Sequence, residues 1–397
     1  MRRFFLMIII TLSLSMVCKA EKPAFELKFH GFVGVSVFSD SRASATARNR
    51  HIYLYPLSED LSTEGIDLNK RGEFNIDVTQ SRFGVDLIGP TFKNIQTTAM
   101  LEGDFLGNGS GDNNFRLRHA FARFSGERWS LLAGQTWHPL FIPENCPGTV
   151  DLNAGAPFHP LNFSPQIQFS WQALPSTKLL LYVIEQNNFR SAGLPKGSEA
   201  SLQPEFDVQI KWQHNKVWAA LTAGMNTLAL PREIEPTKSP VRVRSFHYNA
   251  SFRYRLPALT IQLEGIYGGN LSGLVMPGGI GITADNKYKP LQTGSLWLGM
   301  HGNRTQGWQP GLFAGYLKSM GSSSELEVVK SLSRHPAIGS VYAISPRVKY
   351  IFGNMWLGAE CQWTTAEWGK SFDAYGVPED TKSFENWRFL LSARYNF

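Results

Sequence analysis

Charged side chains recur at every second position in several apolar segments of this 397-residue chain. In "FRLRHAF", Arg116 and Arg118 share one face of an extended chain, because side chains alternate between the two faces of a β-strand. Arg82 in "SRFGV" and Glu102 and Asp104 in "LEGDF" are placed in the same way. Arginines and carboxylates in this pattern do not resemble a catalytic set. They are suited to line an aqueous passage and to bias which ions pass through it.

Motifs of enzymes and of metal sites are missing from the sequence. It contains no G-x-S-x-G, H-E-x-x-H or C-x-x-C, and its nine histidines are scattered. His119 is expected to face outward or to lie near the interface, as a structural residue, and Phe121 is expected to face the lipid. The "GNGSGDNN" stretch at 107–114 lacks the closing glutamate of a calcium loop and is interpreted as a hydrophilic turn. The sequence therefore predicts no enzyme, no cofactor and no metal site, and the absence of basic clusters gives no support for nucleic-acid binding.

The N-terminus has the features of a secretory signal peptide. Arg2 and Arg3 precede an apolar stretch at 4–17, and a small residue, Ala20, marks the expected cleavage point. The alternatives are a transmembrane anchor, for which the stretch is short, and a lipoprotein signal at Cys18. After removal of residues 1–20 the formal charge falls from +7 to +4, since Arg2, Arg3 and Lys19 are lost. No later apolar run is long enough for a transmembrane helix.

The rest of the chain alternates like β-strands and shows few helical stripes. In "EFDVQIKWQ", for example, apolar residues take every second position and Asp, Gln and Lys take the others. Aromatic residues make up 13% of the chain, and they gather at strand ends, as they do at a membrane interface. We expect sixteen strands, near 25–38, 73–88, 94–105, 115–125, 128–137, 165–174, 178–187, 204–213, 216–227, 242–256, 258–270, 291–302, 309–318, 340–352, 354–365 and 386–397.

The connections between these strands alternate strictly between long and short. Long links include 39–72, 138–164 and 270–290, whereas short ones are as tight as Gly353 alone. Long loops at one end and short turns at the other are typical of outer-membrane barrels, and in hydrocarbon a sheet can pair all its backbone groups only by closing. The sequence predicts an all-β fold: a transmembrane antiparallel β-barrel over 21–397, with long extracellular loops and short periplasmic turns.

The third long loop, 138–164, is more apolar than a loop that extends into water. We expect it to fold into the lumen and form a constriction, carrying Glu144 and Asp151. Arg82, Arg116 and Arg118 on the wall would then face an acidic loop and create a transverse field. The alternatives are a loop that makes subunit contacts or caps the mouth, and arginines that only form salt bridges within the wall, with Asp86, Glu102 or Asp104 as partners.

Several segments resemble one family of porins. "NIDVTQSRFGV", "EGDFLG", "FRLRHAFARF", "LLAGQTWHPLF", "DLNAGAPFHPLNFSPQIQFS" and "ISPRVKY" are similar, in this order, to segments of DcaP-like and related general porins of Gram-negative outer membranes. "HIYLYPLSEDL" and "GIDLN" resemble the Bacteroidetes-type branch. The resemblance implies trimeric sixteen-stranded channels with the third loop in the lumen. One departure is Gln168, where relatives often carry arginine. The resemblance therefore implies less about charge selectivity than about the fold.

The sequence thus predicts an outer-membrane porin that lets small hydrophilic solutes, including charged ones, diffuse through a water-filled channel lined by the residues named above. The expected partners are these solutes, membrane lipid, the barrel assembly machinery and two further copies of the chain in a homotrimer. The alternative function is a plugged barrel that serves as a surface adhesin or a structural protein.

The chain ends on an alternating aromatic strand, "FENWRFLLSARYNF". We expect this strand to close the barrel against the first one. Tyr395 and Phe397 resemble the terminal signal that the assembly machinery reads. Cys361 is expected to point outward and Cys146 to lie in the third loop, so both should be free thiols.

Overall fold

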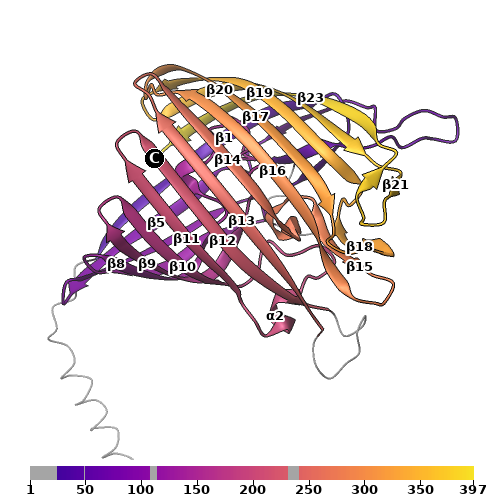
Figure 1. Cartoon of the computed structure of the whole chain (residues 1–397). Coiled ribbons are helices and arrows are strands. Elements are labelled where there is room, and N and C mark those ends of the chain that lie inside the picture. The colour runs from indigo at the N-terminus through magenta and orange to yellow at the C-terminus, as the bar shows by residue number, and fades with distance from the viewer. Residues whose placement is uncertain (1–24, 49, 108–113, 231–240) are drawn as a thin grey trace, which may run out of the picture.

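The wall of the molecule is an antiparallel β-sheet that closes on itself (Figure 1). The structure is a computed structural model, and it describes residues 25–48, 50–107, 114–230 and 241–397. The predicted signal peptide at 1–20 and most of the stretch at 107–114 lie outside these residues. Each wall strand in the described part is paired on both sides, so closure leaves no open edge in the wall.

Sixteen strands of the described residues form this wall, if β4 and β5 are counted as one strand interrupted at 78–81. They are β1 (Glu26–Asp40), β4 (Glu73–Asp77) with β5 (Arg82–Phe92), β6 (Ile95–Asp104), β7 (Arg116–Ser125), β8 (Trp129–Trp137), β9 (Phe163–Leu174), β10 (Thr177–Ile184), β11 (Glu205–His214), β12 (Val217–Ala229), β13 (Arg242–Arg255), β14 (Leu259–Gly269), β16 (Tyr288–Gly302), β17 (Gly307–Gly321), β19 (Ile338–Phe352), β20 (Met355–Trp368) and β23 (Lys382–Asn396). The predicted all-β barrel and its strand order are confirmed.

The last strand closes the barrel against the first. β23 pairs with β1 over nine residues, from Asn396 opposite Phe32 to Arg388 opposite Asp40. Just beyond this ladder, the backbone of Phe397 exchanges two hydrogen bonds of 3.1 Å with Gly31. On its other side, β1 pairs with β4 and β5. The closing seam predicted at the C-terminus is therefore present.

Side chains alternate between the two faces of the wall. On β23, Phe389 and Leu391 lie on the outside with 58% and 61% of their surface exposed, whereas Arg388 on the inside is 1% exposed. Leu390 also points inward and interrupts the polar pattern of this face. It is buried against Val150 of the third long loop, so its apolar character follows from a contact inside the barrel.

Long and short connections alternate as predicted. Seven short turns join the strands at one end, and eight longer loops, which we number L1 to L8, join them at the other. The loops span 41–72, 105–115, 138–162, 185–204, 230–241, 270–287, 322–337 and 369–381. L1, L2 and L5 include residues outside the described ranges.

The long loops contain further elements that the alternation did not predict. These are β2 (Ser44–Ala47) and β3 (Ile52–Pro56) in L1, η1 (Pro143–Asn145) in L3, α2 (Gly197–Ser201) in L4, η2 (Leu271–Leu274) and β15 (Gly278–Ile282) in L6, β18 (Val328–Arg334) in L7, and β21 (Ser371–Phe372) and β22 (Pro378–Glu379) in L8. Figure 1 shows α2, β15, β18 and β21 at the end of the barrel away from the C-terminus. No helix in the described ranges is long and apolar enough to cross a membrane.

A bulge in β7 corrects the expected direction of His119. The register between β6 and β7 shifts at Glu102, which lies opposite His119, and Arg118 is the extra residue. His119 is 7% exposed and its Nδ1 lies 3.0 Å from the hydroxyl of Thr136. The predicted outward orientation was wrong, because the extra residue puts two consecutive side chains on the inner face.

The same bulge reverses the alternation over the rest of β7. Arg123 and Ser125 now line the interior, and Phe121 shares their face, with the Arg123 guanidinium 5.3 Å from its ring centre. The prediction that Phe121 faces outward was therefore also wrong. A single inserted residue moves every later side chain to the opposite face.

Candidate functional site: the lumen and its inward-folded loops

L3 leaves β8 at His138 and follows the inner wall as far as β23 before it returns to β9. Its contacts mark the path. The Gln209 amide of β11 donates to the carbonyl of Pro139 at 2.8 Å, and Asn145 donates to the carbonyl of Leu263 of β14 at 3.0 Å. The Lys349 ammonium of β19 donates to the carbonyl of Gly148 at 3.0 Å. The prediction that the third loop folds into the lumen is confirmed.

The returning part of L3 is attached to the wall by an ion pair. His159 Nδ1 lies 2.7 Å from an oxygen of Glu264 on β14. The same carboxylate accepts hydrogen bonds from Ser251 at 2.8 Å and from the Trp297 indole at 3.0 Å. Burial alone would lower the pKa of His159, but the charge of Glu264 outweighs it and raises this pKa to about 9. The imidazole therefore carries a positive charge at neutral pH.

The apolar residues of L3 form part of a hydrophobic cluster inside the barrel. Phe158 packs against Phe313 of the wall, with ring centres 6.0 Å apart, and Phe141 stacks on Trp137 at 3.7 Å. This cluster accounts for the apolar composition of L3, because these side chains are removed from water. Other members come from L1 and L6, including Ile52, Leu54, Tyr55, Leu271, Leu274 and Met276.

L1 and L6 thus also fold inward, which the sequence analysis did not predict. All five residues of β3 are buried, and the hydroxyl of Tyr53 accepts a hydrogen bond of 3.2 Å from Asn386 of β23. In L6, the carbonyl of Leu274 accepts from the backbone of Leu161 at 3.1 Å. The run of large apolar residues in "HIYLYP" could have indicated that L1 folds inward. Such side chains are stabilised when they leave water, so a loop exposed to water has no use for them.

The predicted charges of the wall form a ladder across β5, β6 and β7. Arg116 makes two hydrogen bonds to Asp104, of 2.9 and 2.6 Å. Arg118 contacts Glu102 at 2.7 Å and Asp104 at 3.2 Å, and Arg82 lies 3.6 Å from Glu102. All five point inward. Because each arginine has a carboxylate partner on the wall, much of the field of these charges is neutralised locally.

The two predicted carboxylates of L3 are paired with other basic residues. Glu144 lies 2.7 Å from the ammonium of Lys211 on β11, and Asp151 lies 3.1 Å from Nε of Arg388 on β23. Burial raises the pKa of Asp151 to about 6, although Arg388 opposes this change. The structure therefore does not bring Glu144 and Asp151 against the three predicted arginines.

A polar pocket of about 540 Å³ occupies the short-turn half of the lumen beneath L3. Gln168 of β9 lines it, as does Glu144 of L3. Four basic residues and two acidic ones share this lining, so it carries a formal surplus of two positive charges. The charged residues are Arg123, Arg128, Lys178, Lys211, Glu127 and Glu144. The sequence analysis selected none of these four basic residues as constriction residues.

The cysteines and the last residues lie where the alternation put them. Cys146 and Cys361 are both free; Cys361 lines an apolar depression of the outer wall together with Phe389, whereas Cys146 lies in L3. Tyr395 and Phe397 are about half exposed, at 50% and 49%. Their role as an assembly signal stays a prediction.

Comparison with known proteins gives both a family match and a fold match. The profile of the DcaP outer membrane protein family matches residues 11–198. A search of the curated proteins gives no match to this sequence.

Among the solved structures that match are an outer membrane channel, a porin and another outer membrane protein. The outer membrane channel DcaP of Acinetobacter baumannii is 16% identical, with a TM-score of 0.73, and the match covers 94% of this chain and 98% of that one. An anion-selective porin from Comamonas acidovorans is 10% identical, with a TM-score of 0.60 and coverages of 94% and 100%. The trimer form of OmpT of Vibrio cholerae is 10% identical, with a TM-score of 0.53 and coverages of 94% and 100%. The chain is therefore an outer-membrane β-barrel of the porin type, and its sequence matches the DcaP family over residues 11–198.

Proposed function

We propose that this porin lets small hydrophilic solutes diffuse across the outer membrane and that it prefers anions. The observation that carries the proposal is the polar pocket beneath L3 with its surplus of two positive charges. A basic lining lowers the electrostatic barrier for anions and raises it for cations. The wall ladder contributes less to this preference, because Arg116 and Arg118 are already paired with carboxylates.

The proposed assembly is a homotrimer in contact with membrane lipid, delivered by the barrel assembly machinery. Support comes from the outer face of the wall, where large apolar side chains such as Phe389 and Leu391 are exposed. Such a face needs lipid or another subunit to cover it. OmpT of Vibrio cholerae, which shares the fold, exists in a trimer form.

A planar bilayer measurement tests the proposed function. The purified barrel should insert and conduct, and the reversal potential in a salt gradient should indicate permeation by anions over cations. Conductance with a reversal potential of the cation-selective sign would refute the anion preference and leave the porin function intact. A folded, inserted barrel that never conducts would refute diffusion through the lumen.

A second candidate, a plugged barrel with a surface role, is favoured by the apolar cluster that L1, L3 and L6 build inside the wall. The two candidates differ in the behaviour of a variant that lacks residues 143–160. A porin conducts before the deletion and conducts more after it. A plugged barrel is silent before the deletion and stays silent, because L1 and L6 still fill the long-loop half.

A further inference from the structure

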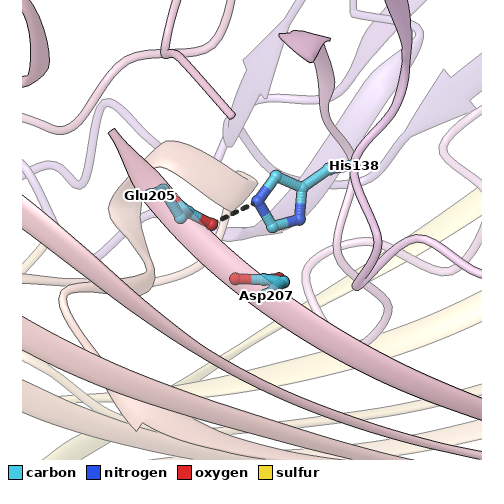
Figure 2. A group of neighbouring side chains, drawn as sticks. All are labelled: His138, Glu205 and Asp207. Carbon is cyan, nitrogen blue, oxygen red and sulfur yellow. Dashed lines mark hydrogen bonds and ion pairs between the residues drawn. The ribbon is translucent and has the colours of Figure 1, made fainter. Parts of the chain in front are cut away.

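Four buried side chains converge at the point where L3 leaves the wall. Figure 2 shows three of them: Glu205 and Asp207 on neighbouring inward positions of β11, and His138 at the start of L3. His138 Nε2 lies 2.6 Å from an oxygen of Glu205. The fourth is His247 of β13, whose Nε2 lies 3.0 Å from Asp207 and 3.7 Å from Glu205. All four side chains are at most 5% exposed.

This set of donors has the chemistry of a divalent transition-metal site. Imidazole nitrogens and carboxylate oxygens are preferred ligands of Zn²⁺, which binds them at about 2.0–2.2 Å in a tetrahedral arrangement. These bond lengths put neighbouring ligand atoms roughly 3.3 Å apart. The separations of 2.6, 3.0 and 3.7 Å lie on both sides of that value. Two neutral imidazoles and two carboxylates would also balance the charge of the ion.

A second observation at the same place points to a ligand. The amide N–H of Asn226 on β12 donates a hydrogen bond to Glu205. The amide oxygen of the same side chain has no hydrogen-bond partner among the described residues, although Asn226 is 92% buried. Asn226 lines a cavity of about 20 Å³ together with His138, Glu205 and His247. That space is large enough for one water molecule, and such a water could be a fifth ligand of an ion and donate to the free amide oxygen.

We propose that His138, Glu205, Asp207 and His247 bind one divalent transition-metal ion, with Zn²⁺ as the best fit, and so fix the start of L3 to the inner wall. The ligands come from L3, β11 and β13. The ion would join the first residue of the loop to two strands that the loop must cross. This inference does not depend on which solutes pass, because metal binding is measured without transport.

Cobalt substitution tests the site on the full-length barrel in detergent. After treatment with a chelator, the protein should bind one equivalent of Co²⁺ and show the visible absorption of a cobalt site with nitrogen and oxygen ligands. One equivalent of Zn²⁺ should displace it. His247→Gln and Asp207→Asn should weaken binding by more than the roughly 10–100-fold that follows loss of an outer hydrogen-bond partner of a ligand.

Two matched controls separate this site from others. His214→Gln changes an exposed histidine on the same strand, β11, and should leave Co²⁺ binding unchanged. Cys146→Ser should also leave it unchanged. No Co²⁺ binding by the wild-type barrel overturns the proposal, as does binding that survives both His247→Gln and Asp207→Asn. A strong thiolate-to-cobalt absorption band that Cys146→Ser removes would place the ion elsewhere and would also overturn it.

Discussion

The pair formed by His159 and Glu264 should make the attachment of the returning part of L3 to the wall depend on pH. Glu264 raises the pKa of His159 from 6.5 to about 9 against the opposing effect of burial. At 1.36 kcal/mol per pKa unit, the folded loop binds this proton more tightly than the open loop by about 3 kcal/mol. Because the folded pKa is the higher one, this stabilisation is complete below pH 6.5 and is lost as the pH rises through about 9.

Hydrogen exchange measures this attachment without any assumption about transport. About 3 kcal/mol corresponds to roughly a hundredfold change in the equilibrium between attached and open loop. Protection factors of backbone amides near His159 should therefore fall by up to about two orders of magnitude between pH 6.5 and pH 10, after correction for intrinsic exchange. In His159→Gln, protection should be lower throughout and nearly independent of pH, since glutamine does not titrate.

The comparison needs one more variant. Cys146 also interacts with the His159 ring, so its contribution has to be separated from that of Glu264. Cys146→Ser should keep the pH dependence. Equal protection in the wild type at both ends of the range, or a pH dependence that persists in His159→Gln, would refute the role assigned to this ion pair.

Three further predictions concern the pocket, the seam and the C-terminus. Replacing Lys178 and Lys211 by glutamate changes the formal charge of the pocket lining from +2 to −2, so the reversal potential in a salt gradient should move toward cation selectivity; no movement would show that the pocket does not set selectivity. Leu390→Ala removes a buried contact with Val150 of L3 and should cost about 2–5 kcal/mol, as such core truncations do. Urea unfolding in lipid vesicles measures that cost. A decrease in the free energy of unfolding below about 1 kcal/mol would mean that Leu390 and Val150 are not closely packed. Deletion of Phe397 removes two hydrogen bonds of the seam and should reduce the amount of assembled barrel more than the conductance of each assembled channel; the reverse result would contradict an assembly role.

The barrel could be predicted from the sequence because strand alternation is a local property. Each wall strand shows its two faces within about ten residues, and the alternation of long and short links fixes which ends lie together. Closure then follows from the need to pair every backbone group of the wall. Even the apolar content of L3 was enough to predict that it folds inward, since apolar side chains gain by leaving water.

The charge partners could not be predicted in this way, because they depend on distances across the lumen. Asp151 was expected to face arginines of β5 and β7 but lies against Arg388, more than two hundred residues away in the chain. The direction of His119 depended on a bulge, which adds one residue without a clear mark in the sequence.

The sequence by itself determined the kind of molecule: a chain whose alternating strands must close, with polar residues inside and aromatic residues outside. The tertiary structure decided what the interior contains. L1, L3 and L6 meet in one apolar cluster, and His138 meets Glu205 and His247 from other parts of the chain. These arrangements depend on which surfaces pack once the barrel has closed, and packing between distant segments leaves no periodic pattern that a single sequence can reveal.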